Sequence, residues 1–258
     1  MTDVITTLSH PRGDYGYDGD YRVIPAPVVA GTYALTCLGL AASAVRAGTR
    51  GSAAALPLGG AAALLTGAGA LAIRTTRVGK FEVWARVLAG LGLRGDERVL
   101  DMGCGRGAVL FAVAGLLPRG RAVGVDIWRA DQTGNGPEAA WRNAELEGVK
   151  DRVDLDTGDM TRLPYDDASF DLIVSSLAVH NLPGMAARLA AIDEATRVLK
   201  PGGRLAIADI GFTRRYAARL RELGMRDVDR RDLGWRAWWT GPWFPTHLVT
   251  ATKPGNRP

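Results

Sequence analysis

The first third of the chain carries two long apolar segments. Residues 23–45 and 51–73 contain no charged side chain, and the short loop between them holds Arg46 and Arg50. At about 1.5 Å of rise per helical residue, roughly 23 residues exceed the ~30 Å hydrocarbon core of a bilayer. The pattern favours a transmembrane helical hairpin over residues 23–79. The alternative is a soluble, alanine-rich hairpin that packs on the rest of the chain.

Basic residues after the second apolar segment predict the orientation of this hairpin. They are Arg74, Arg77, Lys80 and Arg86. Because Lys and Arg collect on the cytoplasmic side of membranes, the domain that follows is expected to face the cytoplasm, as is the polar segment 1–22. The loop between the spans, with its two arginines, would then face outward, against the same tendency. A cleaved signal peptide fits less well, because about 22 polar residues precede the apolar segments.

From Phe81 onward, short apolar runs alternate with helical stretches. This pattern is typical of a mostly parallel sheet covered by helices on both faces. The predicted strands are 98–102, 122–126, 153–157, 170–175, 204–209, 228–233 and 248–252. The predicted helices are 81–93, 139–146, 184–199 and 214–223. The chain therefore divides into a polar segment (1–22), an apolar hairpin (23–79) and an α/β domain (80–258).

Charge and cysteine content argue against two kinds of site. The net charge of +5 is modest, and the basic residues are dispersed among acids, so no nucleic acid is indicated as a partner. The two cysteines, Cys37 in an apolar segment and Cys104 in a glycine-rich turn, form neither a disulfide framework nor a metal-ligand cluster. We therefore expect no metal site, and Cys104 is interpreted as a small residue that fits its turn.

The strongest local signal follows the first strand of the α/β domain. Asp101 ends the apolar strand, and the turn after it has glycine at every second position, at Gly103, Gly105 and Gly107. Glycines permit unusual dihedral angles and let a ligand approach the backbone amides near the start of the following helix. Alone, such a turn is shared by dinucleotide binders and other nucleoside binders.

Four further motifs follow in order. Asp126 ends the second strand, 25 residues after Asp101, where a carboxylate can accept hydrogen bonds from both hydroxyls of a ribose. Gly158-Asp159-Met160 follows the third strand and offers an acceptor for an exocyclic amine and a thioether to lie against a purine. The last two motifs are the fourth strand, 170–175, and the turn into the fifth, 199–205.

This ordered set resembles the class I S-adenosylmethionine-dependent methyltransferase family, and it looks most like the branch with a type 11 methyltransferase domain. The resemblance spans roughly residues 81–253. It implies an α/β, Rossmann-like fold with a seven-stranded, mostly parallel sheet whose last strand is antiparallel. It also implies transfer of a methyl group from S-adenosylmethionine by in-line displacement, for which the protein need only hold donor and acceptor aligned and dry.

The resemblance also implies which residues hold S-adenosylmethionine. They are Asp101, Gly103, Cys104, Gly105, Gly107, Asp126, Ile127, Asp159, Met160 and Ser175. Asp101 would steer the methionine ammonium and Asp126 would hold the ribose. Ile127 or Trp128 would flank the adenine, and Asp159 would accept its amino group. Ser175 would lie beside the cofactor at the end of its strand.

Residues for the acceptor are less clearly marked. His180 follows the fourth strand at the carboxyl edge of the sheet and is the candidate for a general base or substrate orienter, with Asn181 as a companion. The alternative is that His180 only bonds a loop. The polar segment 131–137 is either part of the site's rim or a solvated loop. A tryptophan-rich stretch, 235–244, either caps the sheet edge, walls an apolar pocket or faces a membrane.

Two other functions remain open at this point. A catalytically silent, membrane-bound interaction module would keep the same fold, and a nicotinamide-dependent oxidoreductase shares the glycine turn. The sequence does not specify the acceptor. A lipid, a quinone, a membrane protein and a small soluble molecule all fit, and tethering to a membrane would raise the effective concentration of the first three.

Overall fold

The computed structural model describes residues 2–19, 23–129 and 132–255. Its α-helices are α1 (Thr2–Leu8), α2 (Ala26–Thr49), α3 (Ala55–Arg74), α4 (Lys80–Leu91), α5 (Ala108–Ala114), α6 (Pro137–Glu147), α7 (Gly184–Val198) and α8 (Thr213–Glu222). Its strands are β1 (Arg98–Met102), β2 (Arg121–Asp126), β3 (Val153–Thr157), β4 (Phe170–Ser176), β5 (Leu199–Asp209), β6 (Arg226–Asp232) and β7 (His247–Thr252). Short helical turns are η1 (Thr75–Gly79), η2 (Lys150–Arg152), η3 (Val179–Asn181) and η4 (Trp235–Ala237).

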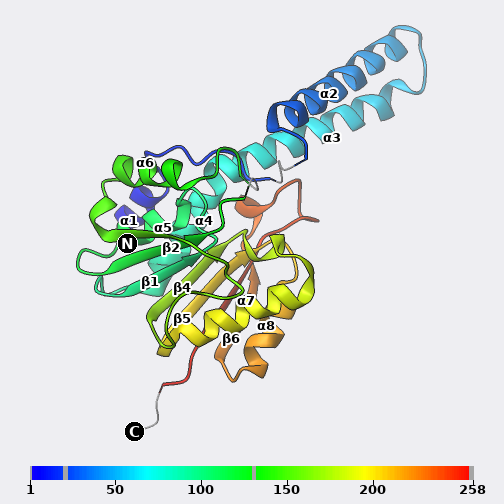
Figure 1. Ribbon diagram of the computed structural model, residues 1–258. Coiled ribbons are helices and arrows are strands. Elements are labelled where there is room, and N and C mark those ends of the chain that lie inside the picture. The colour runs from blue at the N-terminus through cyan, green and yellow to red at the C-terminus, as the bar shows by residue number, and fades with distance from the viewer. Residues whose placement is uncertain (1, 20–22, 130–131, 256–258) are drawn as a thin grey trace.

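The seven strands form one sheet in the order β3-β2-β1-β4-β5-β7-β6. The pairs from β3 to β5 are parallel, whereas β7 runs antiparallel to both β5 and β6. The register of β1 brings Asp101 beside Gly124 of β2 on one side and Val174 of β4 on the other. The predicted fold class is therefore confirmed, with the antiparallel last strand in its expected place (Figure 1).

Two hydrophobic cores cover the faces of this sheet. Successive side chains of a strand point to opposite faces, so Val99 joins the core beneath α4 and α5 while Leu100 and Met102 join the core beneath α7 and α8. All three side chains are fully buried. Because both faces are covered, the central strands are continuously apolar, which is why they were recognisable in the sequence.

The boundaries of β5 differ from the prediction. The strand begins at Leu199, before the Pro-Gly-Gly turn, whereas the sequence predicted a start at residue 204. Leu199 pairs with Phe170, and the register then shifts before Leu172 pairs with Arg204. The glycines allow this irregularity, since Gly202 has a φ of 78°.

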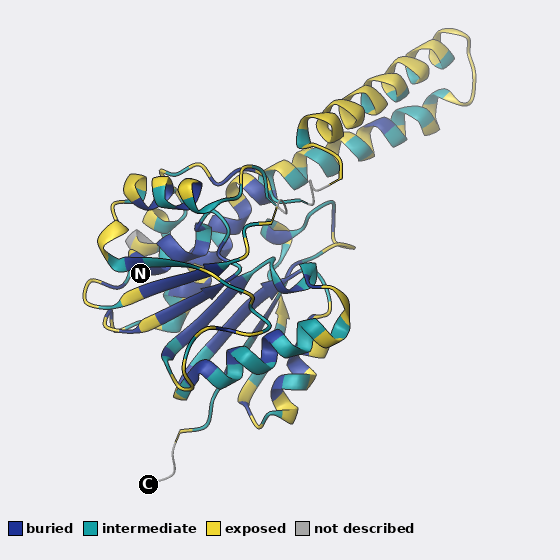
Figure 2. Cartoon of the chain, in the orientation of Figure 1, coloured by how far each residue is buried: buried dark blue, intermediate teal, exposed yellow. Residues whose placement is uncertain are grey.

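The α2–α3 hairpin projects away from the α/β domain (Figure 1). Of its described side chains, none in α2 and only Ala62 in α3 is buried, and Figure 2 shows its surface as mostly exposed. The two helices contact each other, and the Tyr33 hydroxyl donates a hydrogen bond to the Leu65 carbonyl. Both helices are long and apolar enough to cross a membrane. The alternative in which this hairpin packs on the domain is therefore not what is observed.

The polar segment before the hairpin packs against the α/β domain. Tyr15 is 5% exposed, its ring lies 5.2 Å from that of Phe81, and its hydroxyl donates to Glu147 Oε1 at 2.8 Å. Asn143 of α6 bonds the backbone of Asp14 through both its amide oxygen and its amide nitrogen. This segment therefore contributes to the core although its composition is polar.

Candidate functional site

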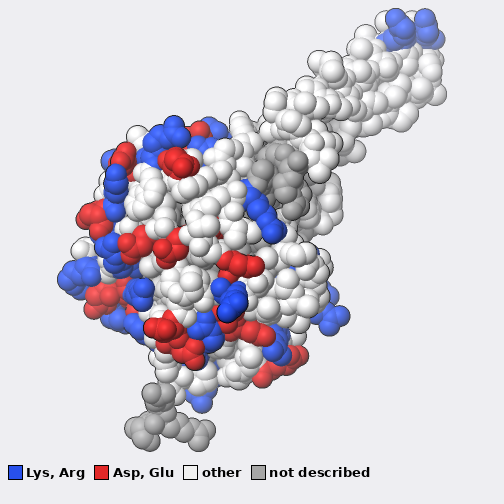
Figure 3. Space-filling model, in the orientation of Figure 1, with Lys and Arg blue, Asp and Glu red and all other residues white. Residues whose placement is uncertain are grey.

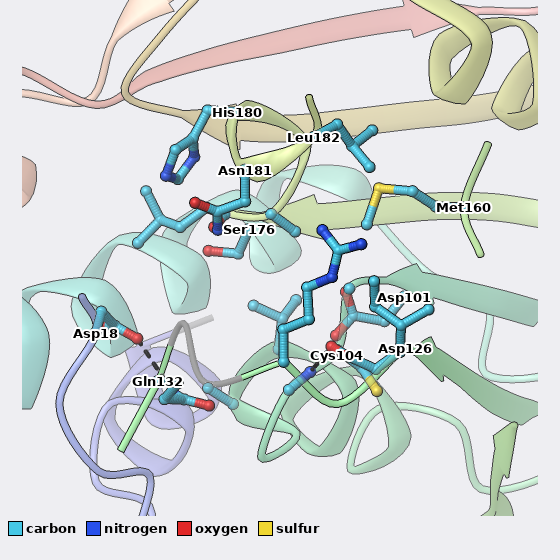
Figure 4. A pocket seen from close by; sticks show the side chains of 18 of the residues that line it. Asp18, Asp101, Cys104, Asp126, Gln132, Met160, Ser176, His180, Asn181 and Leu182 are labelled. Atoms are coloured by element: carbon cyan, nitrogen blue, oxygen red, sulfur yellow. Dashed lines mark hydrogen bonds between the residues drawn. The ribbon is translucent and has the colours of Figure 1, made fainter. Parts of the chain in front are cut away.

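A cavity of about 420 Å³ lies at the carboxyl edge of the parallel strands (Figure 4). Ligands of open α/β sheets bind at this edge, because the loops that follow the strands converge there. Nine of the residues predicted for the site line it: Asp101, Gly103, Cys104, Gly105, Asp126, Ile127, Asp159, Met160 and His180. The β1, β2, β3 and β4 loops thus bring together side chains separated by up to 79 positions in the sequence.

The glycine turn after β1 needs its glycines for steric reasons. Gly103, Gly105 and Gly107 all have positive φ, of 72°, 51° and 87°. A Cβ at Gly103 would lie 2.3 Å from the Cβ of Ala178, which is far inside contact distance. Gly103 and Gly105 line the cavity. Gly107 does not line it; a Cβ there would clash with the ring of Phe111. A ligand in the cavity can therefore approach the backbone of this turn closely, because no side chain covers it.

Asp101 has a buried carboxylate without a compensating partner. It is 1% exposed, and neither of its oxygens has a hydrogen-bond partner of normal geometry among the described residues. Burial and then the nearby Asp126 raise the pKa of Asp101 to about 8, and the Leu110 amide opposes this rise only in part. A buried carboxylate of this kind is destabilising by itself, so it fits a site whose ligand brings a positive charge.

Asp126 is held by backbone amides. Its Oδ2 accepts from the Gly105 amide at 2.8 Å and its Oδ1 from the Trp128 amide at 2.6 Å. Burial raises the pKa of Asp126, and these amides counteract the shift. The Asn135 side chain and the Ile127 amide also hydrogen-bond with this carboxylate, which lines the cavity. This arrangement fits the ribose role that the sequence suggested.

The structure separates the two candidates for the adenine wall. Ile127 lines the cavity and is 36% exposed. Trp128 does not line it, because its positive φ of 58° turns the ring away and its Nε1 donates to Thr157 at 2.8 Å. Asp159 and Met160 line the cavity on the β3 side, where Asp159 also accepts two hydrogen bonds from Thr161.

One predicted side chain points away from the site. Ser175 is fully buried and donates to the Met102 carbonyl at 2.7 Å, and it does not line the cavity. Side chains alternate along a strand, so the next residue, Ser176, faces the cavity instead and accepts a hydrogen bond from Trp84 Nε1. Of the two serines, Ser176 lines the cavity and Ser175 does not.

His180 is fixed by a buried carboxylate that was not among the predicted site residues. Its Nδ1 lies 2.6 Å from Asp209 Oδ1, and its backbone amide donates to Asp209 Oδ2 at 3.0 Å. Asp209 is completely buried at the end of β5, next to the strand that leads to His180. With Nδ1 donating to this carboxylate, Nε2 is the nitrogen that carries the lone pair. Figure 4 shows the imidazole at one side of the cavity.

Three residues close the cavity on the side of the N-terminal segment. Lys80 donates to both Asp18 carboxylate oxygens, at 3.1 and 3.0 Å, and Gln132 Nε2 donates to Asp18 Oδ1 at 3.1 Å. All three line the cavity. No sequence motif marks them, because they lie in three different segments and meet only in the fold. Gln132 belongs to the polar segment 131–137, of which Asp131 lies outside the described residues.

The remaining predictions concern Cys104, metals and the tryptophan-rich stretch. Cys104 is buried, and burial raises the pKa of its thiol well above the usual value, so it fits its turn as a small residue. No group of three or more metal-ligating side chains occurs among residues 2–19, 23–129 and 132–255.

Two rings of the tryptophan-rich stretch, Trp239 and Phe244, line the cavity, whereas Trp235 and Trp243 do not.

Residues 100–207 match a family model described as a methyltransferase domain. The chain is 39% identical over 120 residues to a methyltransferase of Streptomyces halstedii named GfsG. It is also 39% identical over 125 residues to the 27-O-demethylrifamycin SV methyltransferase of Amycolatopsis mediterranei. These matches cover 46% and 47% of this chain and only 40% and 42% of the relatives. The chain therefore matches less than half the length of these relatives.

Solved structures share the fold. An S-adenosylmethionine-dependent methyltransferase from Aquifex aeolicus aligns with a TM-score of 0.53 at 22% identity, covering 66% of this chain and 88% of that one. The [4+2]-cyclase SpnF aligns with a TM-score of 0.55 at 23% identity, covering 67% and 82%. The α/β domain thus has the Rossmann-like fold of these solved structures. Residues 100–207 of this chain match a methyltransferase domain, which is consistent with the class I S-adenosylmethionine-dependent methyltransferase family that its motifs indicated.

Proposed function

We propose that this protein transfers a methyl group from S-adenosylmethionine to an acceptor bound in the cavity at the sheet edge. The observation that carries the proposal is the Asp101 carboxylate, which is buried without a partner beside an open glycine turn. A ligand that brings a cationic ammonium to this carboxylate would compensate its burial. The glycine turn leaves the space that such a ligand requires.

The residues of the cavity fit the parts of S-adenosylmethionine in order. Asp101 and the turn of Gly103 and Gly105 would hold the methionine portion. Asp126 would accept from the ribose hydroxyls, and Ile127 would lie against the adenine. Asp159 and Met160, on the β3 side of the same cavity, would complete the adenine site. When bound, the cofactor supplies a methyl group on a positively charged sulfur.

His180 is proposed as the general base for the acceptor. Asp209 fixes the ring and its tautomer, which leaves Nε2 free to take the proton that an acceptor hydroxyl or amine loses on methylation. Asp209 does not touch the acceptor and is a positioning residue. The apolar side chains around His180, such as Leu177 and Ile210, would keep water from the reacting atoms.

We further propose that the α2–α3 hairpin spans a membrane, with the α/β domain on the cytoplasmic side. The support is the exposure of both apolar helices and the absence of charged residues from 23–45 and 51–73. Figure 3 shows blue side chains only at the far tip of the hairpin on the visible face. The acceptor is proposed to be a small molecule, as in the rifamycin-type relative, or a lipid reached from the membrane.

Calorimetric titration of S-adenosylmethionine into the full chain in nanodiscs tests the cofactor site. The full chain is required because Asp18 and Tyr15 form part of the domain. We expect saturable binding by the wild type and at least a tenfold weaker affinity for Asp126→Ala, whose melting temperature serves as the folding control. A folded wild type that does not bind would favour the silent interaction module. Binding of a nicotinamide dinucleotide instead would favour the oxidoreductase.

Catalysis requires a separate measurement. The wild type and His180→Gln would be incubated with methyl-labelled S-adenosylmethionine and a membrane lipid extract, and labelled products would be separated by solvent partition. Label transferred by the wild type, and reduced at least tenfold in His180→Gln with cofactor affinity unchanged, supports the proposal. Equal transfer by the two proteins would exclude His180 as the base.

A further inference from the structure

We propose that the aromatic turn, residues 235–244, lies in the headgroup region of a phospholipid bilayer and borders the opening through which an amphiphilic acceptor enters the cavity from the membrane. This inference rests on the proposed function for the identity of the reaction. The surface itself is argued from four observations on the hairpin, the turn and the cavity.

The aromatic turn contacts the end of α3 and the helical turn η1 that follows it. The Thr75 hydroxyl donates a hydrogen bond to the Trp238 carbonyl, and the Arg74 guanidinium lies 4.4 Å from the centre of the Trp235 ring. Gly79 is in contact with the turn as well, since a Cβ there would lie 1.9 Å from the Arg236 carbonyl oxygen. These contacts place the turn beside the last residues of α3, where an apolar span that ends at residue 73 would leave the bilayer.

The turn exposes aromatic rings at this level. Trp235 is 46% exposed, Trp243 71% and Phe244 40%. Tryptophan is enriched at membrane–water interfaces, because its ring is apolar while its N–H can hydrogen-bond with water or headgroups. In an aqueous environment three such rings on one short turn would be unfavourable. A bilayer interface at the hairpin root gives them a suitable environment.

Basic side chains lie near the end of α3 as well. Arg74 and Arg77 end the apolar part of the hairpin, and Arg236 lies within the aromatic turn. Their side chains are 31%, 48% and 37% exposed. Glu82 pairs with Arg74 and Arg236, so the charge of this cluster is partly neutralised. Arginines at the end of a span reach lipid phosphates while their aliphatic parts stay in apolar surroundings.

The cavity reaches the same turn. Trp239 and Phe244 line it, and Phe244 is also exposed on the outside. The wall also includes Asp18 and Lys80, and Lys80 begins the helix that continues from the hairpin. A ligand that enters past Trp239 and Phe244 would meet His180 in the same cavity. This order suits an acceptor with an apolar tail in the membrane and a reacting hydroxyl or amine at its head.

Fluorescence quenching by brominated phosphatidylcholine tests the position of the turn. The full chain would be placed in nanodiscs whose lipids carry bromine either near the headgroup or deep in the acyl chain. Trp243→Phe keeps an apolar ring and lies outside the cavity lining, so the cofactor site is left intact. The matched control is Trp141→Phe, in α6, which belongs to neither the hairpin nor the aromatic turn.

We expect Trp243→Phe to lose a measurable share of the shallow quenching, on the order of one tryptophan's contribution, and Trp141→Phe to lose none. Unchanged shallow quenching in Trp243→Phe would overturn the proposal. Protection of Trp243 by a second copy of the chain would overturn it too, and would appear as a dimer in detergent that Trp243→Ser dissociates. Cofactor binding is measured on the same nanodiscs, so failure of the proposed function is detected separately from failure of the membrane contact.

The entrance is tested with a phosphatidylcholine that carries a photoreactive diazirine on its acyl chain. Crosslinks mapped by mass spectrometry are expected at the aromatic turn and on cavity-lining residues such as Leu177 and Ile210. Crosslinks confined to α2 and α3 would overturn the entrance. Phe244→Ala provides a second readout, because widening the opening should increase labelling inside the cavity at least twofold while leaving hairpin labelling unchanged.

Discussion

The imidazole of His180 and the carboxylate of Asp209 form a 2.6 Å contact between the loop after β4 and the end of β5. The same carboxylate accepts the His180 backbone amide and the Ile210 amide, so both the ring and its loop are fixed by one buried acid. Because Asp209 is inaccessible to solvent, it cannot touch an acceptor and can act on one only through the imidazole of His180. This pairing leads to the first prediction.

Asp209→Asn preserves the shape of the side chain and removes its charge. We expect turnover to fall about 10- to 100-fold, because a neutral amide stabilises the protonated ring less and permits the wrong tautomer. Affinity for S-adenosylmethionine should remain unchanged. The measurement is a pH–rate profile with methyl-labelled cofactor: a shifted profile indicates a role in proton transfer, whereas a uniform loss at every pH would indicate a structural role only.

The raised pKa of Asp101 predicts proton release on cofactor binding. In the free protein this carboxylate has a pKa of about 8, so at pH 6.5 it is protonated. A cationic ligand stabilises the ionised form, and binding at pH 6.5 should release close to one proton. Calorimetry in two buffers with different ionisation enthalpies measures this number. A value near zero at pH 6.5 would contradict the assignment of Asp101 to the cationic part of the ligand.

The same shift predicts how stability depends on pH. The pKa of Asp101 rises from 3.8 for an unperturbed aspartate to about 8 in the fold, so between these values the folded state binds more protons than the unfolded state. The stabilisation is complete below pH 3.8 and is lost as pH rises through about 8. Asp101→Asn removes this loss. From pH 5 to pH 9 the wild type should lose about 4 kcal/mol more of its unfolding free energy than the variant, from roughly three pH units below a pKa of about 8, and denaturation at the two pH values measures this difference.

Gly103→Ala tests the glycine turn. The new methyl group would lie 2.3 Å from the Cβ of Ala178, at a φ of 72°, so we expect a loss of stability of about 1–3 kcal/mol and at least a tenfold loss of cofactor affinity. The control is Gly90→Ala in α4, where no atom lies within 4 Å of the new methyl group. That change should be neutral or slightly stabilising in thermal denaturation. Equal effects of the two changes would argue against a special turn.

Leu64→Arg tests the membrane span. Leu64 lies in the middle of α3 and is 72% exposed, so the substitution disturbs no core. An arginine at the centre of a span is unfavourable by about 2.5–3.5 kcal/mol on insertion scales, and we expect less protein in the membrane fraction after alkaline extraction. Leu146→Arg, at a position 51% exposed in α6, is the matched control and should leave the distribution unchanged. Identical distributions of both variants and the wild type would exclude a membrane-spanning role.

Local patterns were sufficient to predict most of the fold. The central strands are apolar because both faces of the sheet are covered, so β1 has the predicted boundaries. The edge strand β3, with alternating apolar and polar residues, has them too. Asp101 and Asp126 were located in the same way, because Asp126 is the last residue of its strand and Asp101 the last but one, at the carboxyl edge of the sheet. The start of β5 was missed, since a strand that begins before a Pro-Gly-Gly turn does not follow the usual pattern of a strand start.

Contacts between distant segments could not be predicted in this way. Asp18 and Lys80 meet at the cavity wall, but neither belongs to a motif, and only the docking of the N-terminal segment brings them together. Asp209 is different: it ends a predicted strand, as Asp126 does, and it could have been selected by asking which acids lie beside the His180 loop. Which of Ser175 and Ser176 faces the cavity depends on the alternation of side chains at the end of β4, which a motif alone does not specify.

The helix that leaves the hairpin does not stop at the domain. It runs through the π-helical turn η1 into α4, whose Trp84 and Leu88 lie in the hydrophobic core, so residues 55–91 form one continuous helix. In the proposed membrane arrangement this connection is a rigid support, and it holds the cavity at a fixed height above the lipid. The enzyme would then select acceptors by the depth at which their reacting atom lies in the bilayer, in addition to their chemical structure.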